Sequence, residues 1–200
     1  MPANRTLNDQ EDAPATEDET LHNVYTFLAL TMRYPDPVFC NDTFFTTMDS
    51  LLASMGWQKE LSAFRQWREE TVDPVDELRT EYTRLFINSA PRKTVHPYAS
   101  VYLDGDNCLQ GRTTERTRDF YRQQGYDLTG TSEPADHISI ELDFLAALAG
   151  EGRHEDLELF LHTLFRPWFQ RFQEKLTQEA RHPFFKVSIQ LIDFFTKEEQ

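Results

Sequence analysis

Residues 16–32 of the chain are TEDETLHNVYTFLALTM, and this stretch sets the expectation for the fold. Thr16 and Glu19 have the spacing of a capping box, in which the two side chains satisfy the free N–H groups at a helix start. Apolar residues then recur every three or four positions, at Leu21, Val24, Tyr25, Leu28 and Met32. This periodicity predicts an amphipathic helix that ends before Pro35.

The same helical spacing continues toward the C-terminus. In the first half of the chain, further helices are predicted after a cap at Asp42, over Gln58–Glu70, and from Pro74 with Asp73 as its cap. In the second half they are predicted over Thr113–Gln124, over Ala135–Ala149, over Glu155–Glu179 with a break at Pro167, and over Pro183–Lys197. No internal repeat and no convincing strand pattern is found. We therefore predict an all-α, single-domain bundle of about eight or nine helices. A disordered acidic tail is expected over residues 1–16, the helical domain over residues 17–200, and a long loop near residues 88–111.

Composition narrows the class of function. A net charge of -14 disfavours binding to nucleic acid or anionic lipid and favours basic peptides, although acidity can also serve solubility alone. Only two cysteines occur, which indicates a reducing compartment. No apolar run reaches the ~20 residues that span a bilayer, and the N-terminus lacks the apolar core of a secretory signal. We expect a cytoplasmic protein with no nucleic-acid partner and no stable membrane insertion.

A first motif, Tyr82-Thr83-Arg84-Leu85-Phe86, ends a predicted helix just before the long loop. Tyr82, Leu85 and Phe86 share one helix face, because they are three and four positions apart. Such a stripe is more often part of a core than a binding surface, and both interpretations stay open. The loop that follows adds ring faces and a hydroxyl group close to the stripe, at Pro97, Ser100 and Tyr102.

A second motif, Glu133-Pro134-Ala135-Asp136-His137, stands where a loop is predicted to enter a helix. Pro134 suits a helix start, and Asp136 is expected in the first turn, where the helix dipole favours a carboxylate. His137 and Glu141 are four apart and should share a face. This group of carboxylates and an imidazole could bind a guanidinium. Ordinary capping of the helix is the alternative.

Together the two motifs and the loop between them resemble a known family. The ordered set Tyr82-x-x-Leu85-Phe86, Pro97-Tyr98-x-Ser100-x-Tyr102 and Glu133-Pro134-x-Asp136-His137 resembles the TorD/DmsD/NarJ group of redox-enzyme maturation chaperones. The loop segment looks most like the TorD branch. The resemblance extends from about residue 20 to the C-terminus. The order and the separation of the three motifs match the family.

The resemblance implies a function. Members of this group are all-helical, cytoplasmic, non-enzymatic proteins that bind the twin-arginine signal peptide of a molybdopterin-containing oxidoreductase precursor. They delay its export until the cofactor is inserted, and some contact the mature part of the client. Weak guanine nucleotide binding and domain-swapped dimers are associated with some members, so the chain is expected as a monomer or such a dimer, with no resident cofactor or metal.

Residue by residue, the resemblance assigns parts of a peptide site. Tyr82, Leu85 and Phe86 would line or support the groove, and Pro97, Ser100 and Tyr102 would shape the loop beside it. The polar end would consist of Glu133, Pro134, Asp136 and His137, with Glu141 on the same helix.

Two other classes of function compete with the chaperone. The first is a small hydrolase or metalloenzyme that uses Asp136, His137 and Glu141 for acid–base chemistry. The second is a structural helical scaffold in which both motifs serve packing alone. Neither a nucleophile motif nor a cysteine at metal-ligand spacing accompanies the acidic residues.

Overall fold

The computed structural model of the protein describes residues 16–88, 93–105 and 109–197. Its elements are α1 (Glu17–Thr31), α2 (Asp42–Ser54), α3 (Gln58–Glu70), α4 (Pro74–Tyr82), η1 (Thr83–Ile87), α5 (Ala99–Leu103), α6 (Arg112–Gln123), α7 (Ile138–Gly150), α8 (His154–Phe160), η2 (Leu161–Phe165), α9 (Arg166–Glu179) and α10 (Pro183–Thr196). Here η1 and η2 are π-helical segments. The tail predicted over residues 1–16 lies outside the described residues except for Thr16.

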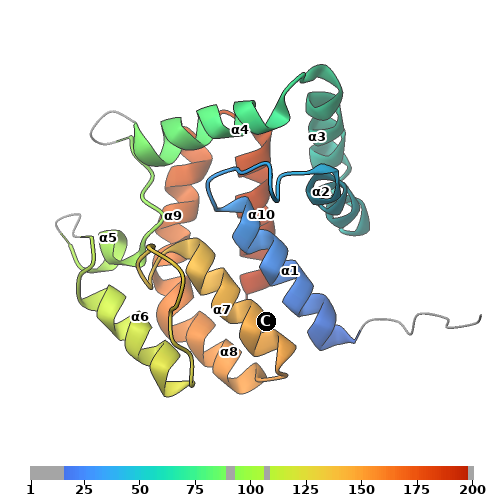
Figure 1. Cartoon of the computed structure of the whole chain (residues 1–200). Helices are drawn as coiled ribbons and strands as arrows, with labels where there is room; N and C mark the ends of the chain where they lie inside the picture. The colour runs from blue at the N-terminus through green and yellow to red at the C-terminus, as the bar shows by residue number, and fades with distance from the viewer. Residues whose placement is uncertain (1–15, 89–92, 106–108, 198–200) are drawn as a thin grey trace, which may run out of the picture.

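These elements confirm the predicted all-helical bundle. Since η1 continues α4 and η2 joins α8 to α9, they form nine continuous helical stretches in the described part of the chain, with no strand there. Figure 1 shows α4 lying across the upper ends of α9 and α10, and α2 and α3 forming a separate pair at one side. In the same described ranges, no helix is long and apolar enough to cross a bilayer.

The first helix packs along the seventh, although more than a hundred residues separate them. Figure 1 shows α1 beside α7, and α1 also contacts α10. The Nδ1 atom of His22 lies 2.8 Å from the carbonyl oxygen of Ala146. A Cβ atom at Gly150 would lie 2.9 Å from the same ring nitrogen, so only glycine fits there without displacing His22. The His22 side chain therefore packs closely on the backbone of α7 at Ala146 and Gly150.

Helix starts follow local capping chemistry. Thr16 accepts the N–H of Glu19 through Oγ1 at 3.2 Å, and Asp73 accepts the N–H of Asp76 at 3.1 Å, as predicted. The cap predicted at Asp42 was wrong, because Asn41 precedes α2 with an extended backbone and accepts the N–H of Phe44 at 3.2 Å. An extended residue before the helix aims its side chain at the free N–H groups.

Loss of one cap should have a measurable effect on stability. We expect Asp73→Ala to lower the free energy of unfolding by about 1 kcal/mol, since a free N–H of α4 loses its acceptor. Asp73→Asn, which keeps an acceptor oxygen, is the matched control and should retain most of the stability. Urea unfolding followed by circular dichroism measures both. Equal losses for the two variants would contradict the capping role.

The predicted break at Pro167 was wrong, because the helix continues through it. A proline in an α-helix lacks a donor N–H and clashes with the carbonyl four residues earlier. Here the turn before it is widened into η2, and the N–H of Arg166 reaches back five residues to the carbonyl of Leu161. The wider turn accommodates the proline, so α8, η2 and α9 form one continuous helical stretch. The predicted loop near residues 88–111 likewise contains α5.

Aromatic rings form much of the core. Ring pairs such as Phe44–Phe184 at 5.9 Å and Phe86–Phe185 at 5.8 Å join helices from both halves of the chain. The largest buried rings are Trp168, Tyr25, Tyr121, Phe64, Phe160, Phe165, Phe169, Phe172, Phe184 and Phe185. Each such ring buries ~150–250 Å² of surface, so this set accounts for a large share of the apolar burial.

Candidate functional site

A groove with a volume of about 520 Å³ lies where the chain leaves α1 and enters α7. Figure 1 shows the loop from the lower end of α6 running up to the start of α7 beside this region. The groove is lined by Arg33, Tyr34, Tyr82, Tyr121, Tyr126, Asp127, Leu128, Thr129, Gly130, Thr131, Glu133, His137, Ser139, Ile140, Asp143, Phe144 and Ala147. Its walls thus combine ring faces with charged groups.

The groove brings together residues from both sequence motifs. Tyr82 lines it from α4, and Glu133 and His137 line it from the start of α7. The motifs are about fifty residues apart in the sequence and share one cavity in space. The other eight predicted site residues do not line it, and their positions explain why.

The aromatic motif is divided between groove and core. Tyr82 reaches the groove, and its ring packs against Tyr34 at 5.4 Å and against Phe86 at 4.6 Å. Leu85 is fully buried, and Phe86 packs inward on Phe185 at 5.8 Å. Phe86 therefore supports the Tyr82 ring from the core side, and Leu85 is part of that core.

The start of α7 differs from the prediction. The helix begins at Ile138 and not at Ala135, so Asp136 precedes the first turn. The reason is pairing with the loop before α5. The N–H of Ala99 donates to the carbonyl of Asp136 at 3.0 Å, and the N–H of Ile138 donates to the carbonyl of Pro97 at 2.9 Å. The carbonyl of Asp136 and the N–H of Ile138 are thus bonded to the segment that contains Pro97 and Ala99. They are therefore not available to a helix that begins at Ala135.

The Asp136 side chain completes this junction. Its Oδ2 atom accepts the backbone N–H of Ser100 at 2.8 Å, and both residues are fully buried. Pro97 is buried in the same place, and Pro134 is half-buried in the turn. These four residues fix the path of the loop, and none of them lines the groove. Their predicted role in peptide binding stays a prediction, and this geometry favours a role in positioning the loop.

Glu141 is buried deeper in the molecule, away from the groove. Its Oε2 atom accepts the indole N–H of Trp168 at 3.0 Å, and Tyr102 stacks on the same indole at 5.8 Å. Burial raises the pKa of Glu141 well above its ordinary value, and the charge of Asp136 raises it further, against the lowering effect of the indole N–H. Burial thus favours the neutral, protonated form of Glu141, and its placement among peptide-contacting residues gains no support from the geometry.

His137 acts as the N-cap of α7. Its Nδ1 atom accepts the N–H of Ser139 at 3.2 Å and lies 2.8 Å from the Ser139 hydroxyl. Burial lowers the pKa of His137 to about 4; the nearby charge of Glu133 opposes this shift and Arg33 adds to it. The imidazole is therefore neutral near pH 7, and because Nδ1 accepts, its proton is on Nε2.

This geometry does not assemble an acid–base centre. Asp136, His137 and Glu141 turn to three separate partners, which are the Ser100 amide, Ser139 and the Trp168 indole. Among the described residues, no group of three or more His, Cys, Asp or Glu side chains is arranged to hold a metal ion. A hydrolytic reaction would need these groups to converge on one reacting atom.

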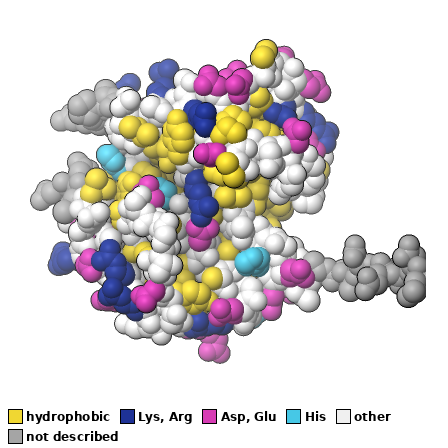
Figure 2. Space-filling model, viewed as in Figure 1, with side chains coloured by type: hydrophobic (Ala, Val, Ile, Leu, Met, Phe, Trp, Pro, Cys, Tyr) yellow, Lys and Arg dark blue, Asp and Glu magenta, His cyan; other side chains and the backbone are white. Residues whose placement is uncertain are grey.

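Charge in the groove is predominantly negative. Asp127, Glu133 and Asp143 contribute three carboxylates to the lining against the one guanidinium of Arg33, and His137 is neutral. Figure 2 shows hydrophobic side chains exposed between basic and acidic ones across the middle of the face seen in Figure 1. Rings for an apolar segment and excess carboxylates for a basic one suit a cationic, hydrophobic peptide.

The sequence motifs missed several lining residues. Arg33 and Tyr34 follow α1, and Asp143 lies in α7, outside every motif. One pattern could have indicated Asp143. The α7 sequence ISIELDFLAALAG is apolar except for Ser139, Glu141 and Asp143, and an acidic residue in such a helix calls for a partner.

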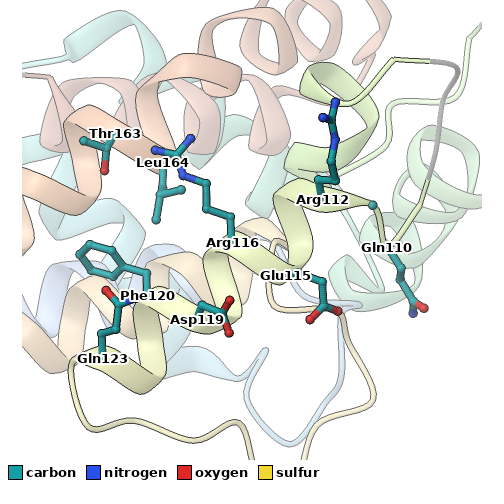
Figure 3. A pocket seen from close by; sticks show the side chains of 10 residues that line it. Gln110, Arg112, Glu115, Arg116, Asp119, Phe120, Gln123, Thr163 and Leu164 are labelled. Atoms are coloured by element: carbon teal, nitrogen blue, oxygen red, sulfur yellow. The ribbon is translucent and has the colours of Figure 1, made fainter.

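A second cavity, of about 680 Å³, lies on α6 and η2. Figure 3 shows Arg116 extending across it toward Thr163 and Leu164, whereas Arg112 and Glu115 point away from each other. Its two arginines are balanced by Glu115 and Asp119, and no predicted site residue lines it. The groove beside α7 is smaller, but it is better matched in charge to a basic segment.

Three comparisons place this geometry among known proteins. Residues 51–174 match the family described as nitrate reductase delta subunit. The Tat proofreading chaperone DmsD of Salmonella typhi is 33% identical over 117 residues, which are 58% of this chain and 57% of DmsD. The chaperone protein TorD of Actinobacillus succinogenes is 26% identical over 153 residues, 74% of this chain and 78% of TorD. The match with DmsD thus spans less than two thirds of that relative's length.

A solved structure shares the fold. The crystal structure of a candidate redox enzyme maturation protein from Archaeoglobus fulgidus superposes with a TM-score of 0.61 and 24% identity. The superposition covers 94% of this chain and 100% of the other. At this level of identity the likeness concerns the arrangement of helices.

Proposed function

The chain belongs to the nitrate reductase delta subunit family, and on that premise we propose that it is a cytoplasmic chaperone for the twin-arginine signal peptide of a molybdopterin-containing oxidoreductase precursor. Family membership confirms the resemblance found in the motifs. Two relatives are chaperones by name, and one is a Tat proofreading chaperone. We propose that binding holds the precursor back until its cofactor is inserted.

The observation that carries the proposal is the shared groove. Tyr82 from one motif meets Glu133 and His137 from the other in a single cavity with excess carboxylates. The ring faces of Tyr34 and Tyr82 would take the apolar part of the signal, and the carboxylates would engage its arginines. In this proposal the protein acts by reversible binding and catalyses no reaction.

Peptide titration tests the proposal directly. The probe is a synthetic peptide with two adjacent arginines followed by an apolar stretch, and the comparison is a scrambled peptide of the same composition. We expect the ordered peptide to bind at least about tenfold more tightly, a difference of about 1.4 kcal/mol. Isothermal titration calorimetry measures both. Equal affinity would indicate simple attraction of cations to an acidic protein and would overturn the proposal.

Glu133→Gln should weaken this binding. Glu133 is exposed at the groove and accepts the Tyr98 hydroxyl at 3.0 Å, a bond that a glutamine oxygen can keep. We expect an affinity about three- to tenfold lower with an unchanged melting temperature, because only the charge is removed. The matched control is Glu158→Gln. The Glu158 side chain is exposed on α8 and lies outside the groove. A similar loss in both variants would show that Glu133 has no specific part.

A further inference from the structure

An internal ion pair occupies the groove. The Nη2 atom of Arg33, two residues beyond the end of α1, donates to Oδ2 of Asp143 in α7. Both residues line the groove, and their side chains are 41% and 36% exposed. The pair is thus reachable by a ligand and is not a closed core contact.

Arg33 holds the position that a ligand's arginine would need. It is the one guanidinium among the described lining residues, and Asp127 and Glu133 add further negative charge around it. Next to Arg33 in the sequence, the Tyr34 ring makes an edge contact with Tyr82, and the Arg79 guanidinium lies over the same ring, 5.7 Å from its centroid. Arg79 is itself fixed, since it donates to the carbonyl of Pro35 at 2.8 Å. The fixed Tyr34 ring and the Asp143 carboxylate line the same groove. An aromatic face and a carboxylate are the two kinds of group that a guanidinium binds well.

Exchange of one guanidinium for another would cost little. An ion pair this exposed typically contributes little to stability, because water already solvates both charges. Burial raises the pKa of Asp143, and the charge and hydrogen bond of Arg33 offset that effect only in part. The carboxylate is therefore only partly compensated by Arg33. A ligand's arginine that engaged both of its oxygens would gain the stronger bidentate geometry.

We propose that Arg33 is a built-in substitute for a client arginine, and that client binding transfers Asp143 from Arg33 to the incoming guanidinium. This inference rests on the proposed function and deepens it, because it assigns Asp143 as a recognition residue and Arg33 as its competitor. The exchange also explains a preference for arginine, since the ammonium of lysine is a point charge without the planar fork that matches a carboxylate.

Charge-matched variants test the exchange. We expect Arg33→Ala to raise the affinity for the twin-arginine peptide about tenfold, because the internal competitor is removed. Asp143→Asn should lower the affinity about tenfold, and in that background Arg33→Ala should have no further effect. Arg33→Gln provides a second variant that retains more of the side chain, in case the alanine variant is unstable.

The chain offers a matched control pair. Arg65 and Asp49 form an ion pair with contacts of 2.5 and 2.7 Å between α3 and α2, outside the groove. Arg65→Ala and Asp49→Asn change the net charge in the same way as the groove variants. We expect each to alter the peptide affinity less than about twofold, because long-range charge effects are screened by salt. Equal effects of Arg33→Ala and Arg65→Ala would overturn the inference.

A smaller probe separates this inference from the proposed function. N-acetyl-arginine amide is titrated into the full chain and followed by NMR, with N-acetyl-lysine amide as the comparison. We expect saturable arginine binding in Arg33→Ala, weaker binding in the wild type, and none in Asp143→Asn. If the wild type binds the twin-arginine peptide but Arg33→Ala improves neither probe, the exchange is wrong and the chaperone proposal stands. If no peptide binds, the chaperone proposal fails and the arginine amide still tests the pair.

Discussion

Glu141→Gln should make the protein progressively more stable than the wild type as the pH rises above about 5. The Glu141 carboxyl is fully buried, and burial and Asp136 raise its pKa well above the ordinary value. Above pH 4.5 the unfolded chain releases this proton while the folded chain keeps it. The folded state then binds one more proton, so the wild type loses about 1.4 kcal/mol of unfolding free energy per pH unit from this group until the folded pKa is reached. Glutamine has no such proton.

The pH dependence of the difference isolates this one group. Glutamine keeps an oxygen to accept the Trp168 indole N–H, so the contact is retained. The variant should gain stability relative to the wild type with each pH unit above the unfolded pKa, up to the raised folded pKa of Glu141. Groups that the substitution leaves unchanged contribute equally to both proteins, so their contributions cancel in the difference. Urea unfolding at four or five pH values measures the difference, and Glu158→Gln on the surface is the control. A difference that does not change with pH would mean that Glu141 is ionised in the folded protein.

Asp136→Ala is expected to lower the free energy of unfolding by about 3 kcal/mol. The substitution removes the acceptor of the Ser100 N–H, and an unpaired buried donor costs about 1–3 kcal/mol. It also leaves a void in a fully buried place. Because the same junction fixes the path into His137, the affinity for a twin-arginine peptide should fall as well.

The matched variant is Asp136→Asn. Its side-chain oxygen can still accept the Ser100 N–H, so we expect less than half of the loss caused by alanine. Guanidinium unfolding of both variants, with tryptophan fluorescence as the readout, gives the comparison. If alanine costs no more than asparagine, the hydrogen bond to Ser100 is not what holds the loop against α7.

Much of the fold could be predicted because its determinants are local. The caps at Thr16 and Asp73 and the span of α3 follow from side chains within one turn. The errors arose where distant segments meet. The start of α7 is moved to Ile138 by hydrogen bonds to Pro97 and Ala99, some forty residues earlier. No periodicity within α7 carries that information.

The candidate site divides in the same way. Tyr82, Glu133 and His137 were found through short motifs, and these three line the groove. Spacing rules put His137 and Glu141 on one helix face and Asp136 in the first turn beside them, but Asp136 and Glu141 turn inward to buried donors. The Arg33–Asp143 pair spans 110 positions, so neither residue indicates the other in a linear reading. The two charged side chains become neighbours only when α1 packs along α7 in the folded protein.

The close packing of α1 on α7 has a consequence for biosynthesis. Since α1 is synthesised before α7, it lacks its main packing partner until residues 138–150 have been made. At roughly 5–20 residues per second this delay is on the order of ten seconds. During this time the apolar face of α1 cannot pack against α7. Until α7 has been synthesised, the nascent chain lacks Asp143, so the Arg33–Asp143 pair cannot form. Competence to hold a client would therefore appear late and all at once, when translation has passed α7.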